Sequence, residues 1–477
     1  MKEEAVPPAS PSDRAPTPLG LYTEAPPAAD RVRGGAAPAL RHARAAIDAL
    51  FGAPSTRLFA VRYWDGSVEH GTDAAPYTLC INRQGSLRRM LLPPNELAIV
   101  EAYISGDVDI EGDLEAAVSL GDAINERLRS PRTLYSLVRH LLALPTREPA
   151  PQAEVHAASA TRVVAPTGRP HEQTRDRAAI QYHYDVGNDF YALWLDERMV
   201  YSCAYFRSPA DTLAEAQRAK LDLVCRKLRL RSGERFLDVG CGWGALIMHA
   251  AREYGVHALG ITLSDAQAVL ARKRIAEAGL EDRCRVEIRD YRALPADQRF
   301  DKIASVGMIE HVGLEKLSTY FECLHRALAP RGMLLNHGIV SMNATRQRGL
   351  RALIERRLWK RDAFIDQYVF PDGKLAPLHA VIAAAEAAGF ETRDVESLRE
   401  HYALTLRAWV ARLMRERDRA TAIAGDRIVR TWRLYMTGSA HAFARGSINV
   451  VQTLLVKADE AGRVALPLTR EDLLKTP

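Results

Sequence analysis

The chain has 477 residues, of which 47% are hydrophobic, and a formal net charge of +6 at pH 7. This length is enough for two domains, and the mild basic charge suits an anionic membrane surface or nucleic acid without deciding between them. No apolar run reaches the roughly 18 residues of a membrane-spanning helix, and the opening MKEEAVPPASPSDRAP lacks the apolar core of an export signal. The six cysteines are scattered without metal-ligand spacing, so we expect a cytoplasmic protein with neither disulfides nor a metal site.

The first part of the chain divides by composition into a tail, a small domain and a linker. Residues 1–40 are rich in Pro, Ala and Gly and are predicted to be disordered. Residues 41–145 regain apolar patterning, with strands predicted at RLFAVRYWDGS and PYTLCIN and helices around a Gly/Asp turn after residue 94. Residues 146–173 are again rich in Pro, Ala and Thr, which is typical of a linker.

From residue 174 to residue 477, short apolar runs alternate with helical patterns. The runs RFLDV, HALGIT, CRVEI, DKIASV and MLLNHGIV are separated by segments such as AEAQRAKLDLVCRKLRL, which places Leu221, Val224 and Leu228 on one helical face. This alternation predicts an α/β domain with a parallel sheet covered by helices on both faces. Ligands of such sheets bind at the carboxyl ends of the strands. HYALTLRAWVARL and NVVQTLLVK could add edge strands.

A glycine-rich loop, LDVGCGWG, follows the first predicted strand of this domain and precedes a helix. Its glycines, Gly240, Gly242 and Gly244, let the backbone turn sharply and approach a ligand closely. Their spacing differs from that of a dinucleotide loop, and Asp238 stands just before the first glycine. The arrangement resembles motif I of the class I S-adenosylmethionine-dependent methyltransferases, in which the glycines pass under the amino-acid end of the cofactor. A dinucleotide loop and an ordinary strand–helix turn remain alternatives.

Polar residues follow the next two strands in the order that this cofactor requires. Thr262 and Gln267 could hydrogen-bond a ribose, whereas Asp290 and Tyr291 could hold an adenine by a hydrogen bond and by stacking. Each of them alone could equally be a helix cap or a turn former. Their succession along the chain favours a cofactor site.

A series of further motifs narrows the resemblance. HYDVGNDFYALWLDERMVYSCAYF, SVGMIEHVG, QYVFPDG, HYALTLRAW and the glutamine of NVVQTLLVK occur in one order. Together with the glycine loop and GITLSDAQ they resemble the cyclopropane fatty-acyl-phospholipid synthase family, which includes the mycolic acid cyclopropane synthases. The resemblance implies a Rossmann-like class I methyltransferase domain with a seven-stranded, mostly parallel sheet. Residues 41–145, especially EAYISGDVDIEGDLEAA, resemble that family's smaller α+β lipid-associated domain.

The resemblance also implies a reaction and a set of site residues. Such enzymes transfer a methylene group from S-adenosylmethionine to the cis double bond of an unsaturated acyl chain in a membrane phospholipid, with a bound bicarbonate ion as the general base. Carried over to this sequence, the bicarbonate contacts are the Cys203 backbone, Glu310, His337, Ile339 and Tyr368.

For Glu310 several roles remain open. It could orient His337, accept a proton from the anion, or stay protonated because burial raises its pKa. A plain first-turn helix carboxylate is the structural alternative.

Two further positions follow from the same resemblance. Tyr201 and Ser202 resemble the family's contact to the cofactor carboxylate. Ser439 stands in MTGSAHAF, where family members commonly carry a cysteine once regarded as catalytic. If bicarbonate is the base, this substitution need not abolish activity.

The remaining expectations concern the class of protein and its partners. We expect peripheral association with the inner membrane surface, a phospholipid bilayer as partner and, from the resemblance, a homodimer. The basic and apolar segment 345–361 could dock on an anionic bilayer or form an ordinary surface helix. A branched-chain fatty acid product, a small-molecule N- or C-methyltransferase and a lipid-binding protein with a vestigial cofactor site remain alternatives. Nucleic-acid methylation is the least favoured.

Overall fold

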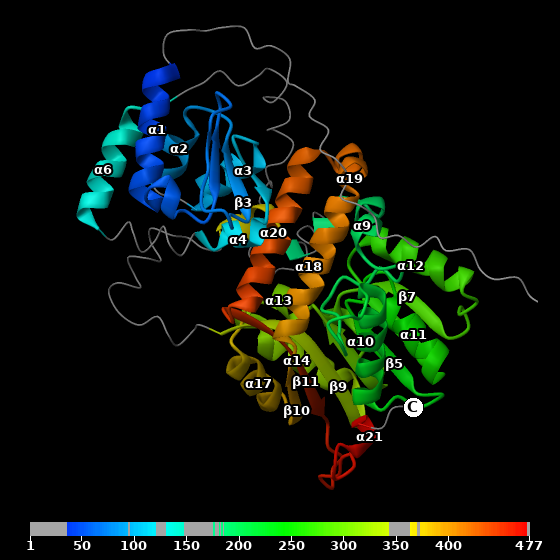
Figure 1. Ribbon diagram of the computed structural model, residues 1–477. Helices are drawn as coiled ribbons and strands as arrows, with labels where there is room; N and C mark the ends of the chain where they lie inside the picture. Colours follow the sequence, from blue (N-terminus) through cyan, green and yellow to red (C-terminus); the bar gives the residue numbers. More distant parts are fainter. Residues whose placement is uncertain are drawn as a thin grey trace, which may run out of the picture.

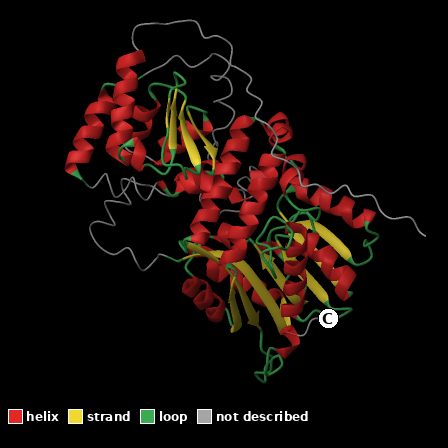
Figure 2. Cartoon of the chain, in the orientation of Figure 1, coloured by secondary structure: helices red, strands yellow, loops and turns green. Residues whose placement is uncertain are grey.

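The computed structural model describes residues 36–93, 96–120, 130–146, 175–176, 181, 183–184, 186–342, 363–369 and 373–474. Within these residues the chain forms two α/β units, and two long helices of the second unit lie against the first (Figures 1 and 2). Most of the predicted linker and the basic segment 345–361 lie outside the described residues.

The amino-terminal unit is a four-stranded sheet with helices around it. Its elements are α1 (Ala36–Phe51), η1 (Pro54–Thr56), β1 (Ala60–Tyr63), β2 (Val68–Glu69), β3 (Tyr77–Ile81), α2 (Ser86–Leu91), α3 (Glu96–Ile104), β4 (Val108–Gly112), α4 (Leu114–Val118) and α6 (Pro131–Leu142). The strand order is β2-β1-β3-β4, with β1 parallel to β3 and the other pairs antiparallel. Two expectations need adjustment. Helix α1 starts inside the predicted tail and buries Ala39, and the predicted Gly/Asp turn contains strand β4.

The second unit is built on a seven-stranded sheet. Its elements are α9 (Asn188–Trp194), α10 (Leu213–Leu228), β5 (Arg235–Val239), α11 (Ala245–Tyr254), β6 (His257–Thr262), α12 (Asp265–Glu277), β7 (Cys284–Ile288), η2 (Tyr291–Ala293), β8 (Phe300–Val306), α13 (Ile309–Val312), η3 (Leu314–Lys316), α14 (Leu317–Ala327), β9 (Leu328–Ser341), α16 (Ala363–Tyr368), α17 (Leu378–Ala387), β10 (Glu391–Ser397), α18 (Arg399–Arg415), α19 (Arg417–Ala424), α20 (Asp426–Ala444), β11 (Ile448–Val456) and α21 (Glu471–Leu474).

The order of these strands is β10-β11-β9-β8-β5-β6-β7, and only β11 runs antiparallel to its neighbours. The predicted class I methyltransferase architecture is therefore confirmed. Both late segments that were expected at a sheet edge are placed differently. NVVQTLLVK forms β11, which lies between β9 and β10, and HYALTLRAWVARL lies in α18. The buried apolar residues of that helix, Ala403, Leu406, Trp409 and Leu413, recur at helical spacing, whereas a strand would bury every second residue.

Helices cover both faces of the sheet and the carboxyl ends of its strands. One apolar cluster joins α10, α11 and α12 to one face, and a second joins α14 and α17 to the other. A third, aromatic cluster gathers α9, α18, α20 and the segment around Met199–Ala204. Trp243, which lies in the glycine loop after β5, belongs to this third cluster, so the aromatic layer adjoins the carboxyl ends of the strands.

The amino-terminal unit packs against α20 and α18 of the second unit, as Figure 1 shows. The Arg430 guanidinium donates to Asp109 Oδ2 at 2.6 Å, and Arg407 forms a bidentate pair with Glu115 at 2.7 and 2.8 Å. A small apolar cluster joins α3 to α16, with Leu434 and Tyr435 of α20 packed against it. Helix α20 therefore contacts the amino-terminal unit and the aromatic cluster at once.

None of the helices in the described part of the chain is long and apolar enough to cross a membrane.

Candidate active site

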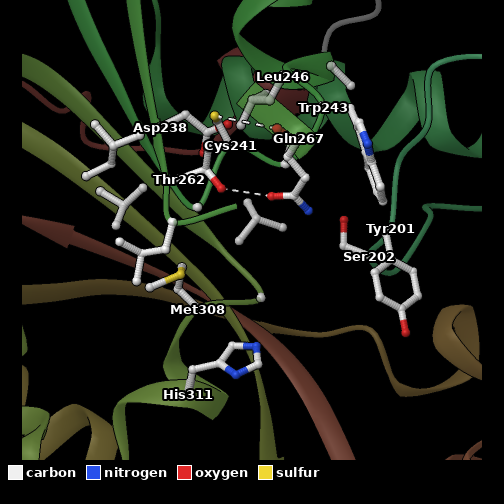
Figure 3. Close-up of a pocket in the computed structure, with 18 of the residues that line it drawn as sticks. Tyr201, Ser202, Asp238, Cys241, Trp243, Leu246, Thr262, Gln267, Met308 and His311 are labelled. Carbon is white, nitrogen blue, oxygen red and sulfur yellow. Dashed lines mark hydrogen bonds between the residues drawn. The ribbon is translucent and has the colours of Figure 1, made fainter. Parts of the chain in front are cut away.

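A pocket opens beside the carboxyl ends of β5, β6 and β8. Figure 3 shows Asp238, Cys241 and Thr262 on one side and Tyr201, Ser202 and Trp243 on the other, with Met308 and His311 at one end. The predicted cofactor residues that line this pocket are Tyr201, Ser202, Asp238, Gly240, Gly242, Thr262, Gln267, Asp290 and Tyr291. Gly244, the remaining one, is not among the residues that line it.

The three glycines of the loop have different tasks. Gly240 has a φ of +83°, and a Cβ there would lie 2.5 Å from Met308 Cγ. Gly242 has a φ of +53°, and a Cβ there would meet open space, because this stretch of backbone borders the pocket. Gly244 has a φ of +84° and starts α11 against Ala271, which explains its place outside the pocket. Gly242 thus leaves room for a ligand to approach the backbone.

Asp238 is the last residue but one of strand β5, and its buried side chain lines the pocket. Burial raises the pKa of Asp238 to about 7, and the nearby Lys220 ammonium opposes this shift. Within the described residues, Asp238 Oδ1 is buried and has no hydrogen-bond partner. An unpartnered buried carboxylate oxygen is costly, so this atom fits the ammonium group at the amino-acid end of the cofactor.

Thr262 and Gln267 hold each other at the end of β6. The Thr262 hydroxyl donates to Gln267 Oε1 at 2.8 Å, and Ser264 caps α12 by accepting from the Gln267 N–H. Figure 3 shows the Gln267 amide nitrogen on the side of Tyr201 and Ser202. The amide donors of Gln267 are therefore oriented toward the pocket, as a ribose contact needs.

Asp290 and Tyr291 line the pocket as parts of its wall. The Asp290 carboxylate accepts from the Arg292 backbone and from its guanidinium, both at 2.8 Å. Tyr291 is 7% exposed, and its ring packs edge-to-face on Tyr320 in the core. The Arg292 guanidinium lies 5.3 Å from the centroid of the Tyr291 ring, so protein already occupies part of the ring face that was predicted to stack on adenine. Arg292, to which the sequence motif assigned no role, also neutralises Asp290.

The segment Tyr201–Cys203 is clamped from helix α10. That helix starts at a capping box of Thr212 and Glu215, and it carries Gln217 and Lys220 one turn apart. The Gln217 amide donates to the Ser202 carbonyl at 2.9 Å, and Lys220 Nζ donates to Ser202 Oγ at 2.9 Å.

Glu310 lies in α13, directly after β8 ends. The Gly307 N–H donates to the His337 carbonyl, and the Ile339 N–H donates to Glu310 Oε1 at 2.8 Å. Glu310 thus continues the hydrogen bonding along β9 beyond the end of β8. Its other oxygen, Oε2, is buried and unpartnered in the described part of the chain, and burial raises the pKa of Glu310 to about 7.

His337 is held from strand β11 rather than by Glu310. The Gln452 amide donates to His337 Nδ1 at 3.1 Å, which places the ring proton on Nε2. Burial, together with the charges of Lys220 and Lys227, lowers the pKa of His337 to about 3, so the ring is neutral. His337 Nε2 is buried without a partner among the described residues. Gln452, a motif residue to which no role was assigned, is therefore the group that orients His337.

Cys203 contributes its backbone rather than its thiol. The Cys203 side chain is fully buried, and burial raises the pKa of its thiol far above the ordinary value. The thiol donates to the Ala204 carbonyl at 3.2 Å, so it is not an activated nucleophile. For the Cys203 N–H, no acceptor is found within the described residues.

The structure engages Tyr368 with the amino-terminal unit. Its hydroxyl, at the end of α16, donates to Glu101 at 3.1 Å. Tyr402 of α18 is a second candidate for the tyrosine of this cluster. Burial raises the pKa of Tyr402, and Tyr435, Cys203 and Glu310 raise it further, so the phenol lies near Cys203 and Glu310. HYALTLRAW carried the signal, but interpreting it as a strand concealed the helical phase.

The other two residues close to this cluster are Ser439 and His311. Ser439 of α20 and Tyr201 both adjoin the Tyr435 phenol, whose pKa burial raises while these two neighbours lower it. His311 lines the pocket, and burial lowers its pKa to about 4, so its ring is neutral. No group of His, Cys, Asp or Glu that could hold a metal is present among the residues described.

These features define a class I S-adenosylmethionine-dependent methyltransferase: the strand order, the glycine loop at the end of β5, and a pocket with unpartnered polar atoms that suits the cofactor. Residues 171–453 match the family described as mycolic acid cyclopropane synthetase, and residues 46–125 match a domain family of unknown function. The chain belongs to the mycolic acid cyclopropane synthetase family.

The relatives include proteins that match most of the chain and shorter proteins that match 59% of it. A probable fatty acid methyltransferase of Pseudomonas putida is 40% identical over 417 residues, which cover 87% of this chain and 96% of the relative. Cyclopropane mycolic acid synthase 1 of Mycobacterium tuberculosis is 38% identical over 291 residues, 59% of this chain and 98% of the relative. The crystal structure of mycolic acid cyclopropane synthase CmaA1 with SAH is 37% identical, with a TM-score of 0.55, and covers 59% of this chain and 98% of its own.

Proposed function

We propose that this enzyme uses S-adenosylmethionine to add a one-carbon unit to the cis double bond of an acyl chain in a membrane phospholipid, forming a cyclopropane fatty acid. The observation that carries this proposal is the group of polar atoms around Glu310. Glu310 Oε2 and His337 Nε2 are buried without a partner, and the Cys203 N–H has no acceptor, all within the described residues. Such atoms cost free energy unless a bound group satisfies them.

A bicarbonate ion suits these atoms. The Cys203 N–H and the His337 Nε2–H are donors, and Tyr402 adds a phenol beside them. Glu310 would repel an anion if it were charged. Because burial raises the pKa of Glu310 to about 7, a large fraction of the molecules retain the proton near neutral pH, and Oε2 can then donate a hydrogen bond to the anion.

The proposed reaction is a methyl transfer followed by ring closure. S-adenosylmethionine supplies a methyl group bonded to a sulfonium. The double bond of the acyl chain attacks this carbon, the carbon–sulfur bond breaks, and S-adenosylhomocysteine leaves as a neutral thioether. A positive charge remains on the other carbon of the former double bond. Loss of a proton from the new methyl group to bicarbonate lets that carbon bond to the cation and close the ring. Aligning a weak nucleophile is worth about 7–11 kcal/mol at best, so positioning by the pocket walls matters.

The aromatic cluster suits the second requirement, which is exclusion of water from the cation. The ring of Tyr201 lies 5.5 Å from those of Tyr191 and Trp194 and 5.3 Å from that of Trp409, measured between centroids. Packed rings leave little room for water, which would otherwise trap the cation as an alcohol.

A branched-chain product is the second candidate. A relative that matches 87% of this chain is a probable fatty acid methyltransferase, and the tuberculostearic acid methyltransferase of Mycobacterium tuberculosis is 32% identical over 83% of this chain. The names of these relatives favour an acyl substrate. They do not decide whether the carbocation closes a ring or yields a branched chain. A likeness to coclaurine N-methyltransferase, at 18% identity, concerns the fold alone.

Bicarbonate dependence tests the proposal. Purified enzyme is assayed with S-adenosylmethionine and liposomes of cis-monounsaturated phospholipid, in bicarbonate-depleted buffer and after bicarbonate is restored. We expect ring formation to fall on depletion and to recover on addition, and Glu310→Gln to stay low in both. Full activity without bicarbonate would contradict the role given to the anion, and the absence of any lipid product would contradict the substrate.

A further inference from the structure

Helix α10 brings a buried lysine to the pocket that no sequence motif pointed to. Lys220 is 2% exposed, lines the pocket, and donates from Nζ to Ser202 Oγ at 2.9 Å. One turn earlier, Gln217 is fully buried and donates to the Ser202 carbonyl. Two side chains of one helix therefore fix both the backbone and the hydroxyl of Ser202.

The charge of Lys220 is not balanced by a direct ion pair. Within the described residues no carboxylate lies within 4.0 Å of Lys220 Nζ, although Asp196 and Asp238 attract it from farther away. Burial of an ammonium without a paired anion is strongly unfavourable. A charge in this position is therefore expected to serve a ligand that brings its own anionic group.

Lys227 shows what a structural lysine looks like on the same helix. It lies about two turns after Lys220 and is equally buried, at 3% exposure. Its Nζ forms an ion pair with Glu396 of β10, and it does not line the pocket. Lys227 is therefore neutralised by an ion pair within the fold, whereas Lys220 lies beside the pocket without one.

We propose that Lys220 is a positioning residue for the amino-acid end of the cofactor: it holds Ser202 against the cofactor carboxylate and supplies the positive charge that balances it. Asp238, with its unpartnered Oδ1 across the pocket floor, receives the ammonium group of the same zwitterion. This inference rests on the assignment of the pocket to S-adenosylmethionine.

The protonation of Lys220 gives the proposal a pH dependence. Burial lowers the pKa of Lys220 to about 8, and the carboxylates of Asp196 and Asp238 oppose this shift, whereas the nearby thiols of Cys203 and Cys225 are neutral at this pH. Lys220 is therefore charged below pH 8 and loses its charge above it. A carboxylate bound next to the ammonium raises the pKa in the complex, so affinity for such a ligand falls as pH rises beyond about 8.

Calorimetry with two ligands tests the proposal without turnover. S-adenosylhomocysteine has the amino-acid end, whereas 5′-methylthioadenosine lacks it. We expect Lys220→Met to weaken S-adenosylhomocysteine binding about tenfold or more, the range for a lost hydrogen bond to a charged group, and to leave 5′-methylthioadenosine binding within about twofold. The matched control, Lys227→Met, removes an equally buried charge and should change neither affinity selectively.

Each outcome has a separate meaning. If the wild type binds S-adenosylhomocysteine and folded Lys220→Met binds it equally well, or loses both ligands alike, the positioning role is wrong and the proposed function stands. If the wild type binds neither ligand, the cofactor assignment itself fails. Should Lys220→Met not fold, Ser202→Ala removes the oxygen that Lys220 holds, and it must show the same selective loss for the proposal to survive.

Discussion

The raised pKa of Glu310 predicts that removing this carboxylate stabilises the protein in alkali while it impairs catalysis. In Glu310→Gln, the amide oxygen can still accept from the Ile339 N–H, so α13 and β9 stay joined. The wild type must ionise a buried carboxyl group above pH 7, whereas the variant carries no ionisable group there. The variant should therefore gain stability relative to the wild type as pH rises.

The size of this effect follows from the shift of the pKa of Glu310 from 4.5 to about 7. Below pH 4.5 the carboxyl group is protonated in both the folded and the unfolded state, so its burial has no pH-dependent effect on stability. Between pH 4.5 and about 7 the unfolded state ionises more readily than the folded state, so the free energy of unfolding falls as pH rises. At pH 8 this difference corresponds to about 3 kcal/mol of lost stability in the wild type. For a domain of this size that is worth about 5 °C in Tm.

Thermal unfolding of wild type and Glu310→Gln at pH 5 and pH 8 measures this directly. The variant also buries an amide donor where Oε2 now lies, which costs free energy at both pH values, so only the change between the two pH values is diagnostic. We expect the Tm of the variant minus that of the wild type to rise by several degrees from pH 5 to pH 8. If this Tm difference stayed constant or fell, the pKa of Glu310 would not be raised in the folded state. The explanation of how a protonated Glu310 binds the anion would then be wrong.

Three further predictions concern the tyrosines, the contact between the two units and the glycine loop. Tyr402→Phe should lower the rate of lipid product formation at least tenfold while its affinity for S-adenosylhomocysteine stays unchanged. The rate of Tyr368→Phe should stay within about threefold of wild type. The opposite ranking in an initial-rate assay would assign the role to Tyr368. Arg430→Met leaves Asp109 without its partner and should cost about 1–3 kcal/mol, measured by the Tm and by faster proteolysis of the amino-terminal unit; unchanged values would mean that this contact is not part of the packing. In Gly242→Ala the new methyl group meets open space but the φ of +53° is strained, so the variant should lose about 1–2 kcal/mol of stability and bind S-adenosylhomocysteine more weakly in calorimetry. Unaltered binding would show that this glycine does not border the cofactor.

The fold was predictable because each strand of the second unit is a short apolar run and each helix has its own periodicity. The glycine loop and the polar strand ends could be ordered along the pocket for the same reason, since the carboxyl ends of parallel strands share one edge. His401–Leu413 was predicted as a strand because its aromatic and β-branched residues suit one. Only the burial of every third or fourth residue identifies α18, and with it the position of Tyr402.

Other parts of the site depend on contacts that no local pattern encodes. Glu310 meets the Ile339 N–H because β8 ends several residues before β9 does, and Gln452 reaches His337 because β11 inserts between β9 and β10. Lys220 lies in a helix whose pattern is that of any amphipathic surface helix. Its burial beside Ser202 is visible only once the segment that contains Ser202 has packed on α10.

The proposed reaction can be followed through the methyl group itself. Purified enzyme would be incubated with S-adenosylmethionine carrying a CD3 group and with liposomes of a cis-monounsaturated phospholipid, and the released fatty acids analysed by mass spectrometry. Ring closure removes one deuteron, so the account predicts a fatty acid that has gained CD2 and lost its double bond. A chain that retains all three deuterons, or one that gains CD2 and keeps a double bond, would indicate a branched product. Acyl chains free of deuterium, in an enzyme that binds S-adenosylhomocysteine, would contradict the assignment to lipid substrates.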